Sequence, residues 1–316
     1  MNILITGGTG QIGSELVPHL REKYPEARIV MTVLPNDLNG GVYGVDEIIV
    51  ELDATNRTTV DRIIALEHPD MIYHLVGILS ARGEQDPQLA WRTNMDSLKY
   101  VLDAAKANGT KRLFWPSSIA VFGPTTPREL TPQYTVLAPT TMYGVTKVAG
   151  ELLCQYYVKK YQLDIRSLRL PGIISYKTKP GGGTTDYAVA MFYEALRQGS
   201  YTSFVRPDTM LPMIYMDDAI RAIDLLMDAP AKSITVRTSY NLAALHFTAA
   251  ELAAEIALRL PGFICHYAPD FRQEIADSWP RSIDDHQART EWKWSPEYTL
   301  TRMVDEMLAN LKKKLN

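Results

Sequence analysis

Short apolar runs and longer amphipathic segments alternate along the first half of the chain. Runs rich in Val, Ile and Leu, typical of strands, lie at 2–6, 28–33, 47–52, 71–76, 111–117 and 164–170. Segments with apolar residues at helical spacing lie between them, at 11–23, 55–67, 87–108 and 139–161. Because the runs are continuously apolar rather than alternating, we expect strands covered on both faces, as in a parallel sheet. The pattern therefore predicts an α/β fold with a doubly wound parallel sheet.

The regular alternation of strand-like and helix-like segments ends after residue 171, and the second half mixes the two types. Gly181, Gly182 and Gly183 form a flexible break, 241–244 is typical of a short strand, and 248–259 and 299–315 of helices. Thr248 and Glu251 have the spacing of an N-terminal capping box. We expect one domain over 1–171 and a smaller mixed α/β domain over 172–316, with interleaved segments.

Composition and charge exclude several classes of partner. Apolar residues make up 46% of the chain, and 33 Lys and Arg against 36 Asp and Glu give a net charge of −3. No basic stripe, no signal peptide and no apolar run of the roughly 18 residues that span a membrane stand out. Cys154 and Cys265 form no CxxC pair, which favours two buried free thiols, and the histidines lack metal-ligand spacing. We expect a cytoplasmic protein without nucleic acid, membrane or metal.

A glycine-rich segment follows the first expected strand. The strand 2–6 runs directly into Thr6-Gly7-Gly8-Thr9-Gly10-Gln11-Ile12-Gly13, so that glycines 7, 10 and 13 form a GxxGxxG pattern. Glycine allows positive φ and close backbone approach, and the helix that follows presents free amides to a phosphate. At the first strand-to-helix turn of an α/β pattern, this predicts a dinucleotide site; a plain tight turn is the alternative.

The residues that would bind the adenosine end of a dinucleotide are less clear. The second strand ends in Val33 without the acid that usually meets the ribose, so Asp37 is the candidate there. Asp53, after the third strand, is a candidate for the adenine amino group, or simply belongs to the start of the next helix. No Lys or Arg lies at 32–37 to meet a 2′-phosphate, which favours NAD over NADP.

Tyr143 and Lys147 form a candidate acid–base pair. Four residues apart in the helix 139–161, they share a face, and the lysine charge should lower the pKa of the phenol from about 10. A tyrosine so tuned acts as a general base. Ser118 ends the strand 111–117, and the carboxyl ends of parallel strands face one crevice. Its hydroxyl could hold the substrate oxygen that Tyr143 deprotonates, or it could be a turn serine.

Together, Thr6–Gly13, Ser118 and the Tyr143/Lys147 pair resemble the extended short-chain dehydrogenase/reductases over nearly the whole chain. The resemblance implies a Rossmann domain that binds NAD, a smaller substrate domain, and a homodimer through helices 87–108 and 139–161. It implies a catalytic tetrad of Asn94, Ser118, Tyr143 and Lys147. The expected cofactor contacts are Gly7, Gly10, Gln11, Ile12, Gly13, Asp37, Asp53, Ala54, Leu75, Gly77, Tyr143, Lys147 and Ile173.

Three further stretches, 168–175, 182–188 and 277–284, are similar to the branch of this family that oxidises the 3-hydroxyl of L-threonine. That resemblance implies L-threonine as the small-molecule substrate, with contacts from Ser80, Ser118, Tyr143, Thr184, Thr185 and Trp279. The alternative is a sugar-nucleotide epimerase or dehydratase that retains its NAD, since it carries the same Tyr–Lys pair. Such enzymes usually have an asparagine near the position of Pro171, where this chain has none.

Overall fold

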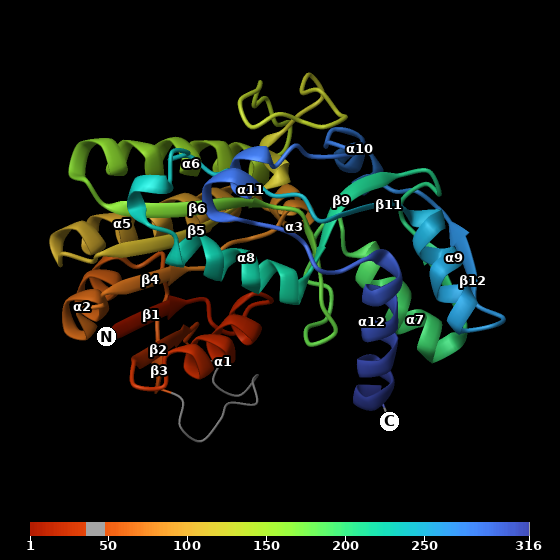
Figure 1. Ribbon diagram of the computed structural model, residues 1–316, viewed down its shortest axis with the longest axis horizontal. Coiled ribbons are helices and arrows are strands. Elements are labelled where there is room, and N and C mark those ends of the chain that lie inside the picture. The colour runs from red at the N-terminus through yellow and green to blue at the C-terminus, as the bar shows by residue number, and fades with distance from the viewer. Residues whose placement is uncertain (36–47, 316) are drawn as a thin grey trace.

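The computed structural model describes residues 1–35 and 48–315, and a seven-stranded parallel sheet forms its centre (Figure 1). The strand order is β10-β6-β5-β4-β1-β2-β3. It confirms the expected doubly wound Rossmann fold. The strands are β1 (Asn2–Thr6), β2 (Arg28–Val33), β3 (Ile48–Glu51), β4 (Met71–His74), β5 (Arg112–Ser118), β6 (Asp164–Leu170) and β10 (Tyr240–Asn241).

Helices cover both faces of this sheet, which explains its continuously apolar strands. In β1, Ile3 and Ile5 face one layer and Leu4 the other, and all three are buried. The first layer contains α1 (Gly13–Lys23) and α8 (Met216–Asp228). The opposite layer contains α2 (Arg57–Glu67), α5 (Ser97–Ala107) and α6 (Met142–Tyr161).

The expected helix 87–108 is interrupted. It consists of α4 (Pro87–Trp91), a π-helical turn over Arg92–Asp96, and α5, and it follows the short α3 (Ser80–Gln85). Asp86 begins α4 by accepting a hydrogen bond from the amide of Leu89 at 3.0 Å. Gly109 has a φ of +69° just beyond the end of α5, as its sequence position predicts. The π-helical turn re-aims Asn94, which lies at its centre.

The second half builds two smaller sheets beside the first. Their orders are β11-β9-β7 and β12-β8, from β7 (Gly172–Ile174), β8 (Ser200–Ser203), β9 (Met210–Tyr215), β11 (Leu245–Thr248) and β12 (Ile264–Tyr267). Around them lie α7 (Tyr187–Gln198), α9 (Ala249–Arg259), α10 (Arg272–Asp277), α11 (His286–Trp292) and α12 (Leu300–Leu315). Figure 1 shows α7, α9 and α12 gathered at the end of the molecule away from α2. The boundary at residue 171 stays a prediction.

Local features of the second half confirm some of the sequence predictions and contradict others. The capping box of Thr248 and Glu251 is confirmed at the start of α9. The single strand at 241–244 is wrong: Asn241 ends β10 in the central sheet, and the chain then crosses to β11 in the second sheet. Of the two free thiols, Cys154 is buried as expected and Cys265 is only half-buried.

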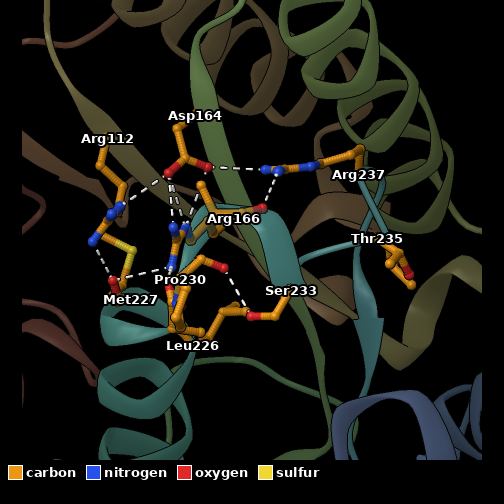
Figure 2. Close-up of polar contacts among 12 residues, drawn as sticks. Arg112, Asp164, Arg166, Leu226, Met227, Pro230, Ser233, Thr235 and Arg237 are labelled. Carbon is orange, nitrogen blue, oxygen red and sulfur yellow. Dashed lines mark hydrogen bonds and ion pairs between the residues drawn. The ribbon is translucent and has the colours of Figure 1, made fainter. Parts of the chain in front are cut away.

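Asp164, at the start of β6, binds three arginines, and two of them, Arg112 and Arg166, tie α8 to the central sheet (Figure 2). Its carboxylate accepts from Arg166 at 2.8 Å, Arg237 at 2.9 Å and Arg112 at 3.1 Å. Burial alone would raise the pKa of Asp164, but these hydrogen bonds and charges outweigh it and hold the pKa below its usual value. Arg166 also donates to the carbonyl oxygens of Leu226 at 2.5 Å and Ala229 at 2.6 Å, at the C-terminal end of α8. The cluster therefore satisfies helix-end carbonyls that burial would otherwise leave unpaired.

Candidate active site

A cavity of about 430 Å³ opens at the carboxyl ends of the central strands. In a doubly wound sheet this is the edge where ligands bind. Its walls come from the turn after β1, the segment after β4, the end of β5, the start of α6 and the chain from Leu170 to Asp186. Fifteen expected site residues line it: Gly7, Gly10, Gln11, Ile12, Gly13, Leu75, Gly77, Ser80, Ser118, Tyr143, Lys147, Ile173, Thr184, Thr185 and Trp279.

The turn after β1 has the geometry of a phosphate cradle. Gly7 adopts a φ of +73°. A Cβ on Gly13 would lie 2.5 Å from the Gly8 carbonyl oxygen and 2.6 Å from the Gly8 Cα, so a side chain there would push the turn apart. At the start of α1 the Ser14 and Glu15 amides donate to the carbonyl oxygens of Gly10 at 2.9 Å and Ile12 at 3.2 Å, so the cradle is formed by the glycine turn itself. These residues fit the pyrophosphate of a dinucleotide.

Tyr143 and Ser118 meet at the inner end of the cavity. Thr141 starts α6 by accepting from the Gly144 amide at 3.1 Å, which places Tyr143 in the first turn. Ser118 ends β5, and its hydroxyl accepts from the Ala120 amide at 3.1 Å. Burial raises the pKa of Tyr143 to about 12, against the opposing effect of its hydrogen bond with Ser118. The expected lowering of this pKa is therefore wrong for the protein alone, because burial disfavours the phenolate.

The contacts of Lys147 explain why its charge has little effect on the pKa of the Tyr143 phenol. Its Nζ donates to the Pro116 carbonyl oxygen at 2.6 Å, and it lies 4.6 Å from the Trp115 ring centre and 5.4 Å from that of Tyr143. Burial lowers the pKa of Lys147 to about 7, although the charges of Cys154 and Glu151 oppose that shift. A lysine of this kind is protonated for only part of the time at neutral pH.

Asn94 lies behind the cavity rather than in its wall. Its Oδ1 accepts from the Ile78 amide at 2.7 Å, and its Nδ2 donates to the Ile78 carbonyl at 3.2 Å and to the Thr146 hydroxyl at 3.1 Å. The Thr146 hydroxyl in turn donates to the Tyr143 carbonyl at 2.7 Å. Asn94 thus joins the segment after β4 to the first turn of α6. Its role toward Lys147 stays a prediction.

The described residues expected at the adenosine end of the site do not line this cavity. Asp53 and Ala54 do not line the cavity; Asp53 accepts from the amide and hydroxyl of Thr55 at 2.9 and 2.7 Å, and Ala54 is buried under the sheet. The side chain of Asp53 is thus engaged locally, in the turn before α2. Asp37 lies outside the described residues.

The residues expected to contact the substrate come from two segments distant in sequence. The hydroxyls of Ser80 and Thr184 lie 2.9 Å apart. Trp279 is buried against the same space. Asp186 accepts from the amides of Gly182 and Gly183, each at 2.8 Å, and so shapes the glycine break. Burial raises the pKa of Asp186, although those backbone hydrogen bonds act in the opposite direction.

The sequence reasoning missed three charged residues of the cavity wall, namely Arg82, Lys179 and Asp186. Their closeness in sequence to Ser80 and to Thr184 was the available signal. Asp186 also lies within the stretch 182–188 on which the resemblance rests, whereas Arg82 and Lys179 belong to no recognisable motif. Within the described ranges, no group of His, Cys, Asp or Glu side chains could hold a metal ion, and no helix is long and apolar enough to cross a membrane.

Comparison with known proteins decides the family. The family model described as "NAD dependent epimerase/dehydratase family" matches residues 3–243. The chain belongs to that family. An uncharacterised epimerase/dehydratase of Staphylococcus haemolyticus is 45% identical to it over 99% of this chain and 98% of that protein. As a member of the NAD-dependent epimerase/dehydratase family, the chain uses NAD as its cofactor, for which the phosphate cradle after β1 is suited.

Two similar solved structures have names that specify an enzyme activity. A GalE-like L-threonine dehydrogenase from Cupriavidus necator, in its holo form, is 48% identical with a TM-score of 0.94, over 98% of this chain and 100% of that one. A monomeric L-threonine 3-dehydrogenase from a metagenome database is 46% identical with a TM-score of 0.94, over 99% and 100% of the two chains. This member of the epimerase/dehydratase family is thus similar over its whole length to enzymes that oxidise threonine.

Proposed function

We propose that the protein is an NAD-dependent L-threonine 3-dehydrogenase. It oxidises the 3-hydroxyl of L-threonine to L-2-amino-3-oxobutanoate. The observation that carries the proposal is that Ser118, Tyr143 and Lys147 line one cavity together with the paired hydroxyls of Ser80 and Thr184. The similarity to solved threonine dehydrogenases over nearly the whole chain supports it.

Each side chain of the cavity has a separate role in the proposed reaction. NAD, when bound, takes the hydride from C3 of the substrate. Ser118 holds the 3-hydroxyl and Tyr143 removes its proton, with Lys147 beside the phenol. Because burial raises the pKa of Tyr143 to about 12, the phenolate needs positive charge nearby, from the Lys147 ammonium and the cofactor. Ser80, Thr184 and Thr185 hold the polar end of threonine, and Trp279 excludes water.

Nucleotide binding is assigned to the remaining wall. Gly7, Gly10, Gln11, Ile12 and Gly13 hold the pyrophosphate, while Leu75, Gly77 and Ile173 pack along the nucleotide. Gln11 already reaches across the cavity mouth, because its Nε2 donates to the Ile173 carbonyl at 3.3 Å. Asp53 and Ala54 are proposed near the adenine, at the carboxyl end of β3, which is the strand edge on which a dinucleotide lies.

The deciding experiment measures NADH at 340 nm with NAD and a panel of L-threonine, L-serine, 3-hydroxy acids and nucleotide sugars. Growth of absorbance with threonine and not with nucleotide sugars is the expected result. No NADH from threonine at any NAD concentration would remove the proposal.

The second candidate is a sugar-nucleotide epimerase or dehydratase that retains its NAD. Curated relatives carry the description epimerase/dehydratase, which favours it. Against it, the asparagine expected near Pro171 in such enzymes is missing. Conversion of a nucleotide sugar without net NADH, followed by chromatography of the products, would establish this candidate instead.

We also propose a homodimer through α6 and the α4–α5 segment. The outer face of α6 exposes Val145, Leu152 and Tyr156, to 40%, 57% and 50%, at spacings that repeat along one side of a helix. Trp91 of α4 is also 44% exposed. Light scattering should give the mass of two chains, and Leu152→Glu should give one. A wild-type protein of single-chain mass would overturn the assembly without touching the chemistry.

A further inference from the structure

Two cations of the cavity wall have no partner among the residues that the structure describes. The wall carries charged side chains at Arg82, Lys147, Lys179 and Asp186 among the residues that the structure describes. Lys147 donates to a carbonyl, and Asp186 is held by the glycine amides. Within the same described ranges, the side chains of Arg82 and Lys179 form neither a hydrogen bond nor an ion pair. Their charges are therefore available to a ligand.

Arg82 lies on the substrate side of the cavity. Its amide approaches the Gly182 carbonyl at 3.4 Å, and a Cβ on Gly182 would lie 3.5 Å from the Arg82 Cβ. Two residues earlier in α3, Ser80 bonds the hydroxyl of Thr184. The first turn of α3 and the segment 182–184 thus form one part of the wall, which Ser80, Thr184 and the exposed Arg82 all line. Lys179 instead follows Lys177, whose ammonium lies 3.3 Å from Glu15 of the nucleotide helix α1.

The next step depends on the charge of the substrate and therefore rests on the proposed function. Threonine brings a carboxylate into this space, and the hydroxyls of Ser80 and Thr184 offer it hydrogen bonds without a compensating charge. A guanidinium matches a carboxylate with two parallel hydrogen bonds. We propose that Arg82 binds the carboxylate of the substrate and so selects a free α-amino acid over a neutral analogue of the same shape.

The experiment compares L-threonine with L-threoninamide, whose amide replaces the carboxylate, in the wild type, Arg82→Gln and Arg82→Lys. Loss of a charged hydrogen-bond partner should raise KM for threonine about tenfold to hundredfold in Arg82→Gln, with a much smaller change in kcat. Turnover of threoninamide should stay the same, and Arg82→Lys should be intermediate. Arg62→Gln, an exposed arginine of α2 outside the cavity wall, is the matched control. NADH affinity, followed by fluorescence, should be unchanged in all variants.

The outcomes separate this inference from the function on which it rests. An unchanged preference for threonine over threoninamide in Arg82→Gln would overturn the role of Arg82 and leave a threonine dehydrogenase. A loss of that preference in Lys179→Gln instead of Arg82→Gln would assign the carboxylate to the other cation. A wild type that makes no NADH from threonine would overturn both.

Discussion

The hydroxyl oxygens of Ser80 and Thr184 lie 2.9 Å apart, although 104 residues separate them in the chain. The Thr184 amide also donates to the Ser80 hydroxyl, at 3.2 Å. Ser80 begins α3 beside the nucleotide wall, and Thr184 belongs to the segment that leads into the second half. Both side chains are buried and both line the cavity. This pair therefore joins two distant segments of the chain in the wall of one cavity.

Ser80→Ala should raise KM for threonine by about tenfold, since one hydrogen bond is worth roughly 0.5–1.5 kcal/mol and the Thr184 amide loses its acceptor as well. NADH affinity should not change, because Ser80 lies away from the glycine turn. Initial rates and NADH fluorescence measure the two quantities. Ser295→Ala, at an exposed serine outside the cavity, is the control. Equal threonine KM values in the two variants would contradict the placement.

Gly13→Ala should weaken NAD binding by about tenfold to hundredfold. The added Cβ would lie 2.5 Å from the Gly8 carbonyl oxygen, and relieving such a contact costs roughly 1–3 kcal/mol. Titration of the protein with NADH measures the affinity. Gly109→Ala is the matched control: its φ of +69° makes it costly for stability, but nothing lies within 4 Å of its Cβ. NAD affinity lowered equally in both variants would show a general loss of fold instead.

The motifs predicted this site only as far as local geometry defines it. The glycine turn, Ser118, Tyr143 and Lys147 were predictable because a strand-to-helix turn and one helical turn place their own residues. Arg82 was not, because its position depends on α3 meeting the glycine break, which is distant in sequence. The pKa of Tyr143 was predicted in the wrong direction because a sequence shows neighbouring charges and not the extent of burial. The pairing of β10 with β6 is likewise a contact between distant segments.

Lys147→Met should stabilise the fold in a pH-dependent way. Burial lowers the pKa of Lys147 to about 7, whereas an unfolded lysine titrates near 10.4. The unfolded chain therefore holds more protons between these values, and the wild type gains stability from this group as pH rises from 7 to about 10. The advantage of the methionine variant should be largest at pH 7 and below and shrink toward pH 10, as measured by urea unfolding. A pH-independent advantage, or the same trend in the exposed Lys232→Met, would argue against it.

Tyr143→Phe should lower kcat for threonine by about a hundredfold to ten-thousandfold, the usual contribution of a general base. Because burial raises the pKa of Tyr143 to about 12, the wild-type kcat/KM should rise with pH across the neutral and alkaline range. The rise should be absent from the phenylalanine variant. NADH affinity is the control, since the ring itself remains. A pH slope retained in Tyr143→Phe would move the base to another group.

Asp164→Asn should lower the free energy of unfolding at pH 7 by about 2–3 kcal/mol, because three arginines lose one carboxylate that is only 18% exposed. Since the pKa of Asp164 is held below its usual value, this stabilisation is present at neutral pH and is lost only as pH falls through that lowered pKa. Asp208→Asn, at a carboxylate 77% exposed beside Arg206, should change stability by less than about 0.5 kcal/mol. Asp164 begins β6, whereas the cavity lies where that strand ends, so threonine kinetics at 25 °C should match the wild type. A loss of turnover in Asp164→Asn would mean that the anchoring of α8 also positions the active site.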